Sequence, residues 1–472
     1  MLRSAALKPH PALFVAALFV AALAFHSSFP GLLGVDGFFH IAQARRMTEL
    51  GIAPEQTWMA HGVVVGAWVD HHWGFHALLM PFARWGLLGG KVATALLGAA
   101  SMSALYLWLR SRKVPQAELW ALVPLALSWS FLFRLMTVRA MCLSTGLLIL
   151  VLHLAVRGPW WGLFLAATGW ALSYHLSVLA VPIALGAWAI PRLMKREGPS
   201  FAHALAGPAG FVTGLLIHPQ SPETVRFFLK HAAIGAGDPS GTEWQPPIPS
   251  EFWMHGGVLL LLVGVVAAIA WRRRAQWTPE TVLLVLGALA GAALTFKSMR
   301  FVEFGAPLLA MAGGLLWRDS GRALRRPILI VAATLLGLGL LANARTAREH
   351  RHPDSQRTLA AAAWMTEHIP AGSRVHNVQW GWWPEWVFAA PQFAYTVGFD
   401  PSLLASEGPD KVDHFQKIRA GYYQQAGPAI RGEFGAEWAV LGLPDPAAGA
   451  LLADPSLEVV FQDAGAAVFK LR

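Results

Sequence analysis

Cysteine and charge are both scarce in this chain. Its 472 residues include one cysteine, and only 14% of them are charged. A single thiol, Cys142, can form neither an internal disulfide framework nor a thiolate metal cluster. Soluble proteins carry about 25% charged residues, whereas 55% of this chain is hydrophobic and its mean hydropathy is +0.46. This composition excludes a water-soluble multidomain enzyme and a disordered chain, and it predicts an α-helical polytopic membrane protein.

Long apolar segments recur along residues 1–345. Because about 20 apolar residues span a bilayer core, they predict about 11 transmembrane helices. The first, residues 11–25, follows Arg3 and Lys8 as a cleaved signal peptide would, but the many later segments favour an uncleaved helix. The other predicted spans lie near 89–109, 119–133, 141–156, 160–174, 176–190, 201–217, 256–271, 282–296, 301–317 and 328–343.

Basic residues fall in alternate loops of this arrangement, which the positive-inside rule assigns to the cytoplasm. The opposite side then receives a first outward loop (30–88), a second large outward loop (218–254) and the tail. We therefore expect a bacterial inner (plasma) membrane protein whose C-terminal domain lies outside the cytoplasm. The cytoplasmic set comprises Arg3, Lys8, Arg110, Arg112, Lys113, Arg157, Arg192, Lys195, Arg196, Arg272, Arg273, Arg274, Arg318, Arg322, Arg325 and Arg326.

The formal net charge is +10. In a soluble protein this excess would suggest binding to nucleic acid, but cationic cytoplasmic loops account for it in a membrane protein. No nucleic-acid partner is therefore expected.

The tail, residues 346–472, differs in composition from the rest of the chain. It is richer in charge and contains no segment long enough to cross a membrane. Short β-type runs at 374–378, 439–441, 458–461 and 467–470 alternate with helix-like stretches at 359–367 and 410–423. This alternation predicts a small soluble extracytoplasmic α/β domain after the transmembrane domain of residues 1–345.

The first outward loop begins with Asp36-Gly-Phe-Phe-His40. A carboxylate at the membrane surface is costly unless it binds a metal, a cation or a hydrogen-bond donor, so Asp36 is a candidate functional residue. The alternative is a helix cap, because Asp is a favoured N-cap and residues 37–50 are typical of an amphipathic surface helix.

Further along, the same loop contains Asp70-His71-His72-Trp-Gly-Phe-His76. These residues are candidate ligands for a divalent metal, and the spacing places His72 and His76 on one helical face. A complete zinc signature such as His-Glu-x-x-His is absent. The alternative is an interfacial belt, because Trp and His both suit the headgroup region.

Cationic residues on the predicted outer side run against the positive-inside bias. A phosphate or pyrophosphate leaving group would explain them, because Arg binds phosphate in bidentate fashion and Lys acts as a point charge. The alternative is contact with anionic lipid headgroups. Lys297, Arg300 and Glu303 are spaced to lie near one helical face. The full set is Arg134, Arg139, His175, His218, Lys297 and Arg300.

Four tryptophans occur within seven residues early in the tail, at Trp380, Trp382, Trp383 and Trp386. Aromatic faces stack on sugar rings or isoprenoid chains, and rings near a membrane also anchor a domain to it. Contact with an acceptor or lipid and plain membrane anchoring both remain open.

These motifs resemble the GT-C superfamily of polytopic glycosyltransferases, which use polyprenyl-phosphate-linked sugars. The Asp36-to-His40 segment is similar to the Asp-x-aromatic-aromatic-His opening of oligosaccharyltransferase catalytic subunits. Trp380-Gly-Trp-Trp-Pro-Glu is similar to their Trp-Trp-Asp-Tyr-Gly signature but lacks its Asp. No Asp-x-Asp or Glu-x-Asp follows in the second outward loop, where Arg134-Leu-Met-Thr-Val-Arg139 stands. Bacterial GT-C-like membrane proteins resemble the chain more closely overall.

The resemblance implies inverting sugar transfer from a polyprenyl-phosphate donor to an extracytoplasmic glycan, lipid or protein acceptor, with membrane lipid as a further partner. It assigns the catalytic role to Asp36, with Asp70 second. Alternatives are an oligosaccharyltransferase proper, a transporter and a non-catalytic scaffold. We further expect the donor phosphate to be bound by Arg139, His175, Lys297 and Arg300. The acceptor or lipid is expected to contact His40, Trp380, Trp382 and Trp383. A divalent cation, Mg²⁺ or Mn²⁺, is expected at Asp36 and His72.

Overall fold

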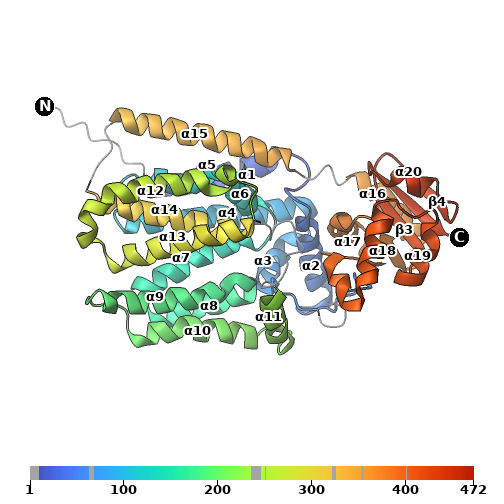
Figure 1. Ribbon diagram of the computed structural model, residues 1–472, viewed down its shortest axis with the longest axis horizontal. Helices are drawn as coiled ribbons and strands as arrows, with labels where there is room; N and C mark the ends of the chain where they lie inside the picture. Colours follow the sequence, from blue (N-terminus) through green and yellow to red (C-terminus); the bar gives the residue numbers. More distant parts are fainter. Residues whose placement is uncertain are drawn as a thin grey trace.

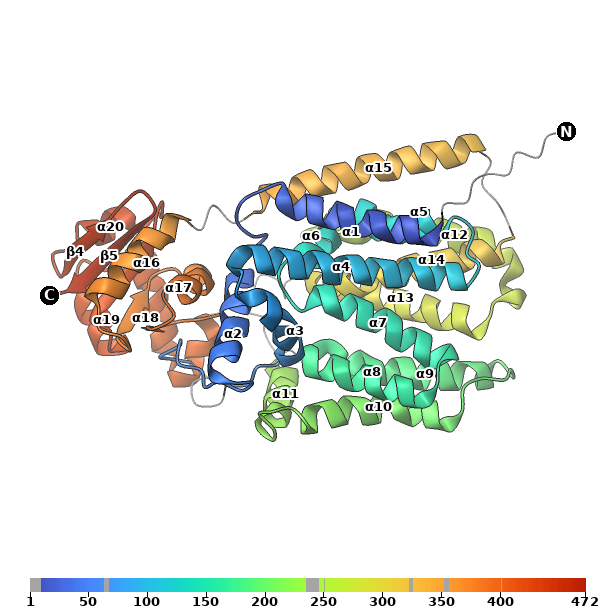
Figure 2. The same ribbon diagram turned by 180° about the vertical axis from the view of Figure 1, so that it is seen from behind.

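The computed structural model describes residues 10–62, 68–234, 246–249, 251–321, 326–351, 356–399 and 401–472. Its elongated shape has a bundle of helices at one end and a mixed α/β part, formed by the C-terminal residues, at the other (Figure 1). The short helices α2 (Asp36–Leu50) and α3 (Trp73–Ala83) lie between them, as the view from behind also shows (Figure 2).

Every apolar segment that the sequence predicts to span the membrane overlaps a helix. One prediction needs correction: the segment 119–133 is two helices, α5 and α6, which meet at an angle of 93°. Ser128 between them is extended, and its hydroxyl accepts a hydrogen bond from Phe131 N, which caps α6. The helices of the bundle are α1 (Pro11–Ser27), α4 (Gly86–Ser111), α5 (Ala117–Leu127), α6 (Trp129–Met136), α7 (Met141–Arg157), α8 (Trp160–Ser173), η1 (His175–Leu179), α9 (Ala180–Leu193), α10 (Phe201–Leu216), α11 (Glu223–Ile234), η3 (Trp253–Gly257), α12 (Val258–Ala270), η4 (Trp271–Gln276), α13 (Pro279–Lys297), η5 (Met299–Phe301), α14 (Val302–Asp319) and α15 (Arg326–Glu349).

Within the described residues, six helices are long and apolar enough to cross a membrane, or seven if the bent pair forms one span. The chain is thus a multi-pass membrane protein, while the count of about 11 spans stays a prediction. Three further apolar helices, α1, α7 and α10, are shorter than the six. Helix α15 lies along the edge of the bundle and continues to Glu349, beyond the domain boundary expected at residue 345.

The basic residues assigned to the cytoplasmic side gather at the end of the bundle remote from the sheet. Glu280, at the start of α13, accepts hydrogen bonds from Arg112 at 2.8 Å and from Arg157 at 3.1 Å. Arg318 donates to the carbonyl oxygen of Arg112, and Arg196 donates to that of Trp277. Arg3, Lys8, Arg322 and Arg325 lie outside the described residues.

The C-terminal part is built around a five-stranded sheet of order β2-β1-β3-β5-β4. Strands β2, β1 and β3 are parallel, whereas β5 runs antiparallel to both β3 and β4. All four predicted β-type runs overlap strands, and only the two-residue β2 is additional. The elements are α16 (Gln356–His368), β1 (Arg374–Asn377), η6 (Trp380–Trp382), α17 (Trp383–Ala389), β2 (Ala394–Tyr395), η7 (Pro401–Glu407), α18 (Pro409–Arg419), α19 (Ala426–Phe434), β3 (Trp438–Gly442), α20 (Ala448–Leu452), β4 (Leu457–Gln462) and β5 (Ala466–Leu471).

An aromatic core joins the first outward loop to the C-terminal part. Phe39 of α2 stacks on Trp383 of α17 with ring centroids 5.4 Å apart. The Trp383 indole also donates to the carbonyl oxygen of Trp58, and both tryptophans are almost fully buried. Burial of aromatic surface of this size is a major source of interface stability. The expected contact of Trp383 with lipid or acceptor is therefore wrong, because its ring packs inside the protein.

Candidate functional site

Asp36 is the first residue of α2, at the end of the bundle that faces the sheet. Its Oδ2 lies 3.0 Å from Nη1 of Arg139, and 44% of its side chain is exposed. The N-cap position of α2 is Val35, and Asp36 follows it as the first helical residue. Asp36 is therefore not the N-cap residue but a half-exposed carboxylate paired with a cation.

Asp70 lies at the start of a buried chain of hydrogen bonds. The Nδ1–H of His76 donates to its carboxylate at 2.7 Å, and Nε2 of His76 lies 2.7 Å from Nδ1 of His40. The chain of hydrogen bonds therefore runs from Asp70 through His76 to His40. Burial alone would raise the pKa of Asp70, but the charge and hydrogen bond of His76 hold it below its usual value.

Both ends of this chain of hydrogen bonds are buried. Asp70 and His40 are each only 4% exposed. Each side chain therefore presents little surface to a substrate, and the role predicted for Asp70 as a second catalytic residue stays a prediction. Burial lowers the pKa of His40 well below its usual value, which keeps its imidazole neutral.

The second outward loop braces the backbone around Asp70. The Nε2–H of His218 donates to the carbonyl oxygen of Asp70 at 3.0 Å, and the Asp70 N–H donates to Oε1 of Gln220. His218 thus connects the predicted second outward loop to the backbone of the first. At the adjoining Gly74, a Cβ atom would lie 2.4 Å from the Ser173 hydroxyl, so glycine lets α3 approach the end of α8 closely.

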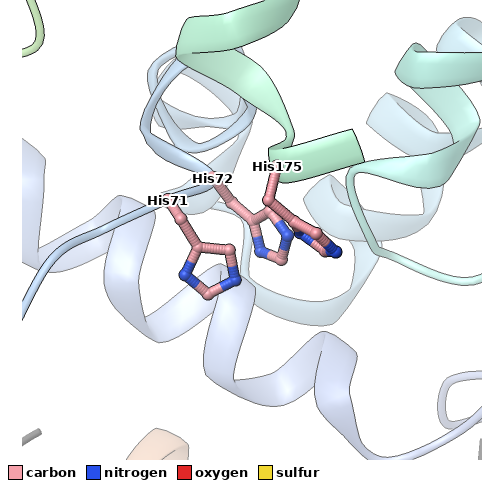
Figure 3. A group of neighbouring side chains, drawn as sticks. All are labelled: His71, His72 and His175. Atoms are coloured by element: carbon pink, nitrogen blue, oxygen red, sulfur yellow. The ribbon is translucent and has the colours of Figure 1, made fainter. Parts of the chain in front are cut away.

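That close approach gathers three histidines, His71, His72 and His175 (Figure 3). One ring nitrogen from each lies within 4.8 Å of the nitrogens of the other two. His72 is 8% exposed, and burial lowers its pKa well below the usual value, so its imidazole is neutral. Of the two residues predicted to share a metal, Asp36 forms an ion pair with Arg139, while His72 lies beside the other two histidines.

Tyr174 connects this histidine cluster to a buried ionic group. Its ring stacks on His72 with centroids 5.4 Å apart, and its hydroxyl donates to Glu303 at 2.7 Å. Arg300 donates to the same hydroxyl at 3.4 Å, and Arg134 donates to Glu303. Arg134 therefore has a carboxylate partner inside the protein, whereas Arg300 lies next to the ring that contacts His72.

The expected helical face of Lys297, Arg300 and Glu303 is not formed. Helix α13 ends at Lys297, Ser298 is extended, and η5 begins at Met299. This break buries Arg300 and Glu303 and leaves Lys297 exposed. Lys297 has no hydrogen bond or ion pair with the described members of the cluster.

Trp380 and Trp382 lie in η6, and each is half-buried. Trp380 packs against the core on one side of the sheet, and Trp382 packs against the core shared with α2. Sequence reasoning named His71 among the candidate metal ligands of the first outward loop but missed Tyr174 as a member of the site. The pair Tyr174-His175 at the end of a predicted span was the available signal.

Comparisons with known proteins identify the fold. The structure superposes on ArnT from Cupriavidus metallidurans bound to undecaprenyl phosphate, with a TM-score of 0.61, 13% identity and 97% of both chains covered. It also superposes on the oligosaccharyltransferase of Archaeoglobus fulgidus in its apo form, with a TM-score of 0.58 and 11% identity. This second match covers 91% of the present chain and 69% of the other. No family model and no curated protein sequence matches the chain. The chain has a GT-C-like fold, as its motifs predict.

Proposed function

We propose that this protein is a membrane glycosyltransferase that transfers a sugar from a polyprenyl-phosphate-linked donor to an extracytoplasmic acceptor. The observation that carries the proposal is a half-exposed carboxylate, Asp36, which is paired with Arg139 at one end of a GT-C-like bundle. The matched ArnT was solved with undecaprenyl phosphate, and a related archaeal oligosaccharyltransferase was solved with dolichol phosphate. These lipids support a polyprenyl-phosphate donor.

Asp36 is the general base of the proposed reaction. Its carboxylate takes the proton of the acceptor hydroxyl or amine, whose heavy atom then attacks the anomeric carbon of the sugar. The ion pair with Arg139 fixes the orientation of the carboxylate while nearly half of the side chain stays exposed. Attack from the side opposite the leaving group inverts the configuration at that carbon.

Cationic groups stabilise the leaving group in the same step. The bond from the anomeric carbon to the phosphate oxygen breaks, and negative charge accumulates on the polyprenyl phosphate. Arg139 and Arg300 are the arginines at this end that contact the site's carboxylate and tyrosine. Donors already in place when this charge develops typically accelerate such a step by about 10²–10³-fold each. Arg134 is not assigned this role, because its carboxylate partner Glu303 is buried, whereas the partner of Arg139 is half-exposed.

The test is an assay of purified full-length protein in lipid nanodiscs with a panel of undecaprenyl-phosphate-linked sugars and a cell-envelope extract as the acceptor source. Release of undecaprenyl phosphate and labelling of the extract are both measured. We expect one donor to be consumed, and we expect Asp36→Asn to lower turnover by about 10²–10⁴-fold, the usual contribution of a general base.

Glu49→Gln is the matched control, because Glu49 is an exposed carboxylate at the far end of the same helix. Its turnover should equal that of the parent protein. Equal turnover of Asp36→Asn and the parent would exclude Asp36 as the base, and a parent that consumes none of the donors would contradict the proposed activity.

We also propose that the C-terminal part lies outside the cytoplasm of a bacterial inner membrane. The clustering of basic residues at the opposite end supports this orientation through the positive-inside rule. A phosphatase that is active only outside the cytoplasm, fused after Arg472, should be active. If a reporter that works only in the cytoplasm were active when fused at the same position, the proposed orientation would be wrong.

A further inference from the structure

Three imidazoles converge at the end of the bundle where the proposed donor phosphate binds. His71 and His72 come from the loop before α3, and His175 begins η1 (Figure 3). Their closest nitrogens lie within 4.8 Å of one another. Nitrogens bound to one tetrahedral zinc ion are about 3.3 Å apart, so small rotations of the rings bring all three within reach of a single ion.

One ring nitrogen of the three histidines has no hydrogen-bond partner in the described part of the chain. Nε2 of His72 is buried and accepts or donates no hydrogen bond there, although the side chain is only 8% exposed. A buried polar atom without a partner is costly, and coordination to a metal would remove that cost.

Aromatic rings hold two of the imidazoles in place. His71 stacks on Phe227 with centroids 5.1 Å apart and an interplanar angle of 18°. His72 stacks on Tyr174 at 5.4 Å and 19°. These contacts come from α11 and from the end of α8, so both predicted outward loops contribute to the cluster.

We infer that His71, His72 and His175 bind one Zn²⁺ ion whose fourth coordination position accepts a phosphate oxygen of the lipid-linked donor. This inference rests on the proposed function for the identity of the phosphate. Imidazole ligands favour zinc over Mg²⁺ or Mn²⁺, which prefer oxygen. Three protein ligands leave a position open, as in catalytic zinc sites.

The charges around the cluster leave that open position suited to an anion. Arg300 contacts the hydroxyl of Tyr174, the ring that stacks on His72. Among the carboxylates nearby, Glu303 pairs with Arg134 and Asp70 accepts a hydrogen bond from His76. A zinc ion held by three neutral imidazoles keeps its charge of two, and with an arginine nearby the site attracts an anionic oxygen.

Zinc content tests the first half of the inference. The full-length protein in nanodiscs is stripped with a chelator, reloaded with Zn²⁺, washed and analysed by mass spectrometry for metal per chain. We expect about one zinc ion per parent chain and a loss of most of it in His72→Ala and in the milder His175→Gln. His255→Gln is the control, because His255 is another buried histidine at the same end of the bundle.

Folding of the variants is checked by the temperature of thermal unfolding in the absence of metal. Zinc should raise this temperature for the parent and for His255→Gln but not for the cluster variants. Equal zinc content in the parent and in both cluster variants would overturn the inference.

Cobalt substitution tests whether a phosphate oxygen binds in the fourth coordination position. Co²⁺ reports its coordination through visible absorption, and we expect undecaprenyl phosphate to change the spectrum of the Co²⁺-loaded parent. An unchanged spectrum would overturn the open phosphate position. Because neither measurement requires sugar transfer, a protein that binds zinc and undecaprenyl phosphate but transfers no sugar would contradict the proposed function and leave the metal site standing.

Discussion

The two ends of the helical bundle use the same residue types in different ways. At the end remote from the sheet, Glu280 is 6% exposed and pairs with both Arg112 and Arg157. At the opposite end, Asp36 pairs with Arg139 but stays 44% exposed. A carboxylate enclosed between arginines stabilises the fold, whereas one that is fixed but exposed remains available for chemistry. Charge alone therefore does not distinguish these two carboxylates, whereas their exposure does.

Removing the enclosed carboxylate should produce the largest change in stability. Glu280→Ala leaves the guanidinium of Arg112, whose side chain is 1% exposed, buried without its anion. We expect a loss of about 3–5 kcal/mol in the free energy of unfolding, the usual cost of breaking a buried pair by deleting one partner. Thermal unfolding in nanodiscs measures it.

Glu197→Ala is the matched control, since Glu197 is an exposed carboxylate at the same end. Its unfolding should stay within about 0.5 kcal/mol of the parent. The activity of each folded Glu280→Ala molecule should be unchanged. If Glu280→Ala were as stable as the parent, or if it folded but lacked activity, the carboxylates at the two ends would not differ in role as described.

An arginine of the opposite end should show the reverse pattern. Arg300→Ala removes a proposed donor to the leaving phosphate, and we expect turnover to fall by about 10²–10³-fold. Lys297→Ala and Arg157→Ala are the controls, because Lys297 is exposed and Arg157 belongs to the remote end. Steady-state turnover of the three variants is measured with the donor that the parent protein consumes in the panel assay. If Lys297→Ala lost as much turnover as Arg300→Ala, the break at Ser298 would not separate Lys297 from the site.

The helices were predictable from the sequence because apolar length is a local property. Each predicted apolar segment is helical, and the four predicted β-type runs lie in strands. The bend at Ser128 was missed, because it depends on one extended serine within an otherwise apolar stretch, and hydropathy averaged over a span does not register one residue. Ser298 lies in the turn predicted between the spans 282–296 and 301–317, but helical spacing did not predict that its extended backbone separates Lys297 from Arg300 and Glu303.

The site was predicted in composition but not in pairing. Asp36, His72, His175 and Arg300 were all singled out, yet the expected partnership of Asp36 with His72 is replaced by Arg139 in one case and by two histidines in the other. These pairings join residues far apart in the sequence, and no local spacing encodes them. The burial of Trp383 was unpredictable for the same reason, since its partner Phe39 lies in the first outward loop.

A third carboxylate sharpens the comparison because its exposure is intermediate. Glu407 ends η7 and is 32% exposed. It accepts hydrogen bonds from the N–H of Gly62 at 2.5 Å and from Lys411 at 2.7 Å, and His61 lies 2.9 Å away. His61 and Gly62 belong to the first outward loop, so Glu407 connects that loop to the C-terminal part.

The pH dependence of this connection has a defined sign. Burial would raise the pKa of Glu407, but the hydrogen bonds from Gly62, Lys411 and His61 lower it from 4.5 to about 2. A carboxyl group whose pKa is depressed in the folded state stabilises that state fully above the unfolded value and loses the contribution as pH falls towards the folded value. The stabilisation should therefore be complete at neutral pH and decline below about pH 4.5.

Glu407→Gln should remove this contribution at a cost of about 1 kcal/mol, the smallest of the predicted effects, because a partly exposed pair is screened by solvent. Thermal unfolding at neutral pH should show the variant to be less stable than the parent, and the two should converge at acidic pH. Glu458→Gln, on the exposed face of β4, should match the parent throughout. A difference between Glu407→Gln and the parent that stayed constant from neutral to acidic pH would mean that the Glu407 side chain stabilises the connection through packing rather than through its charge.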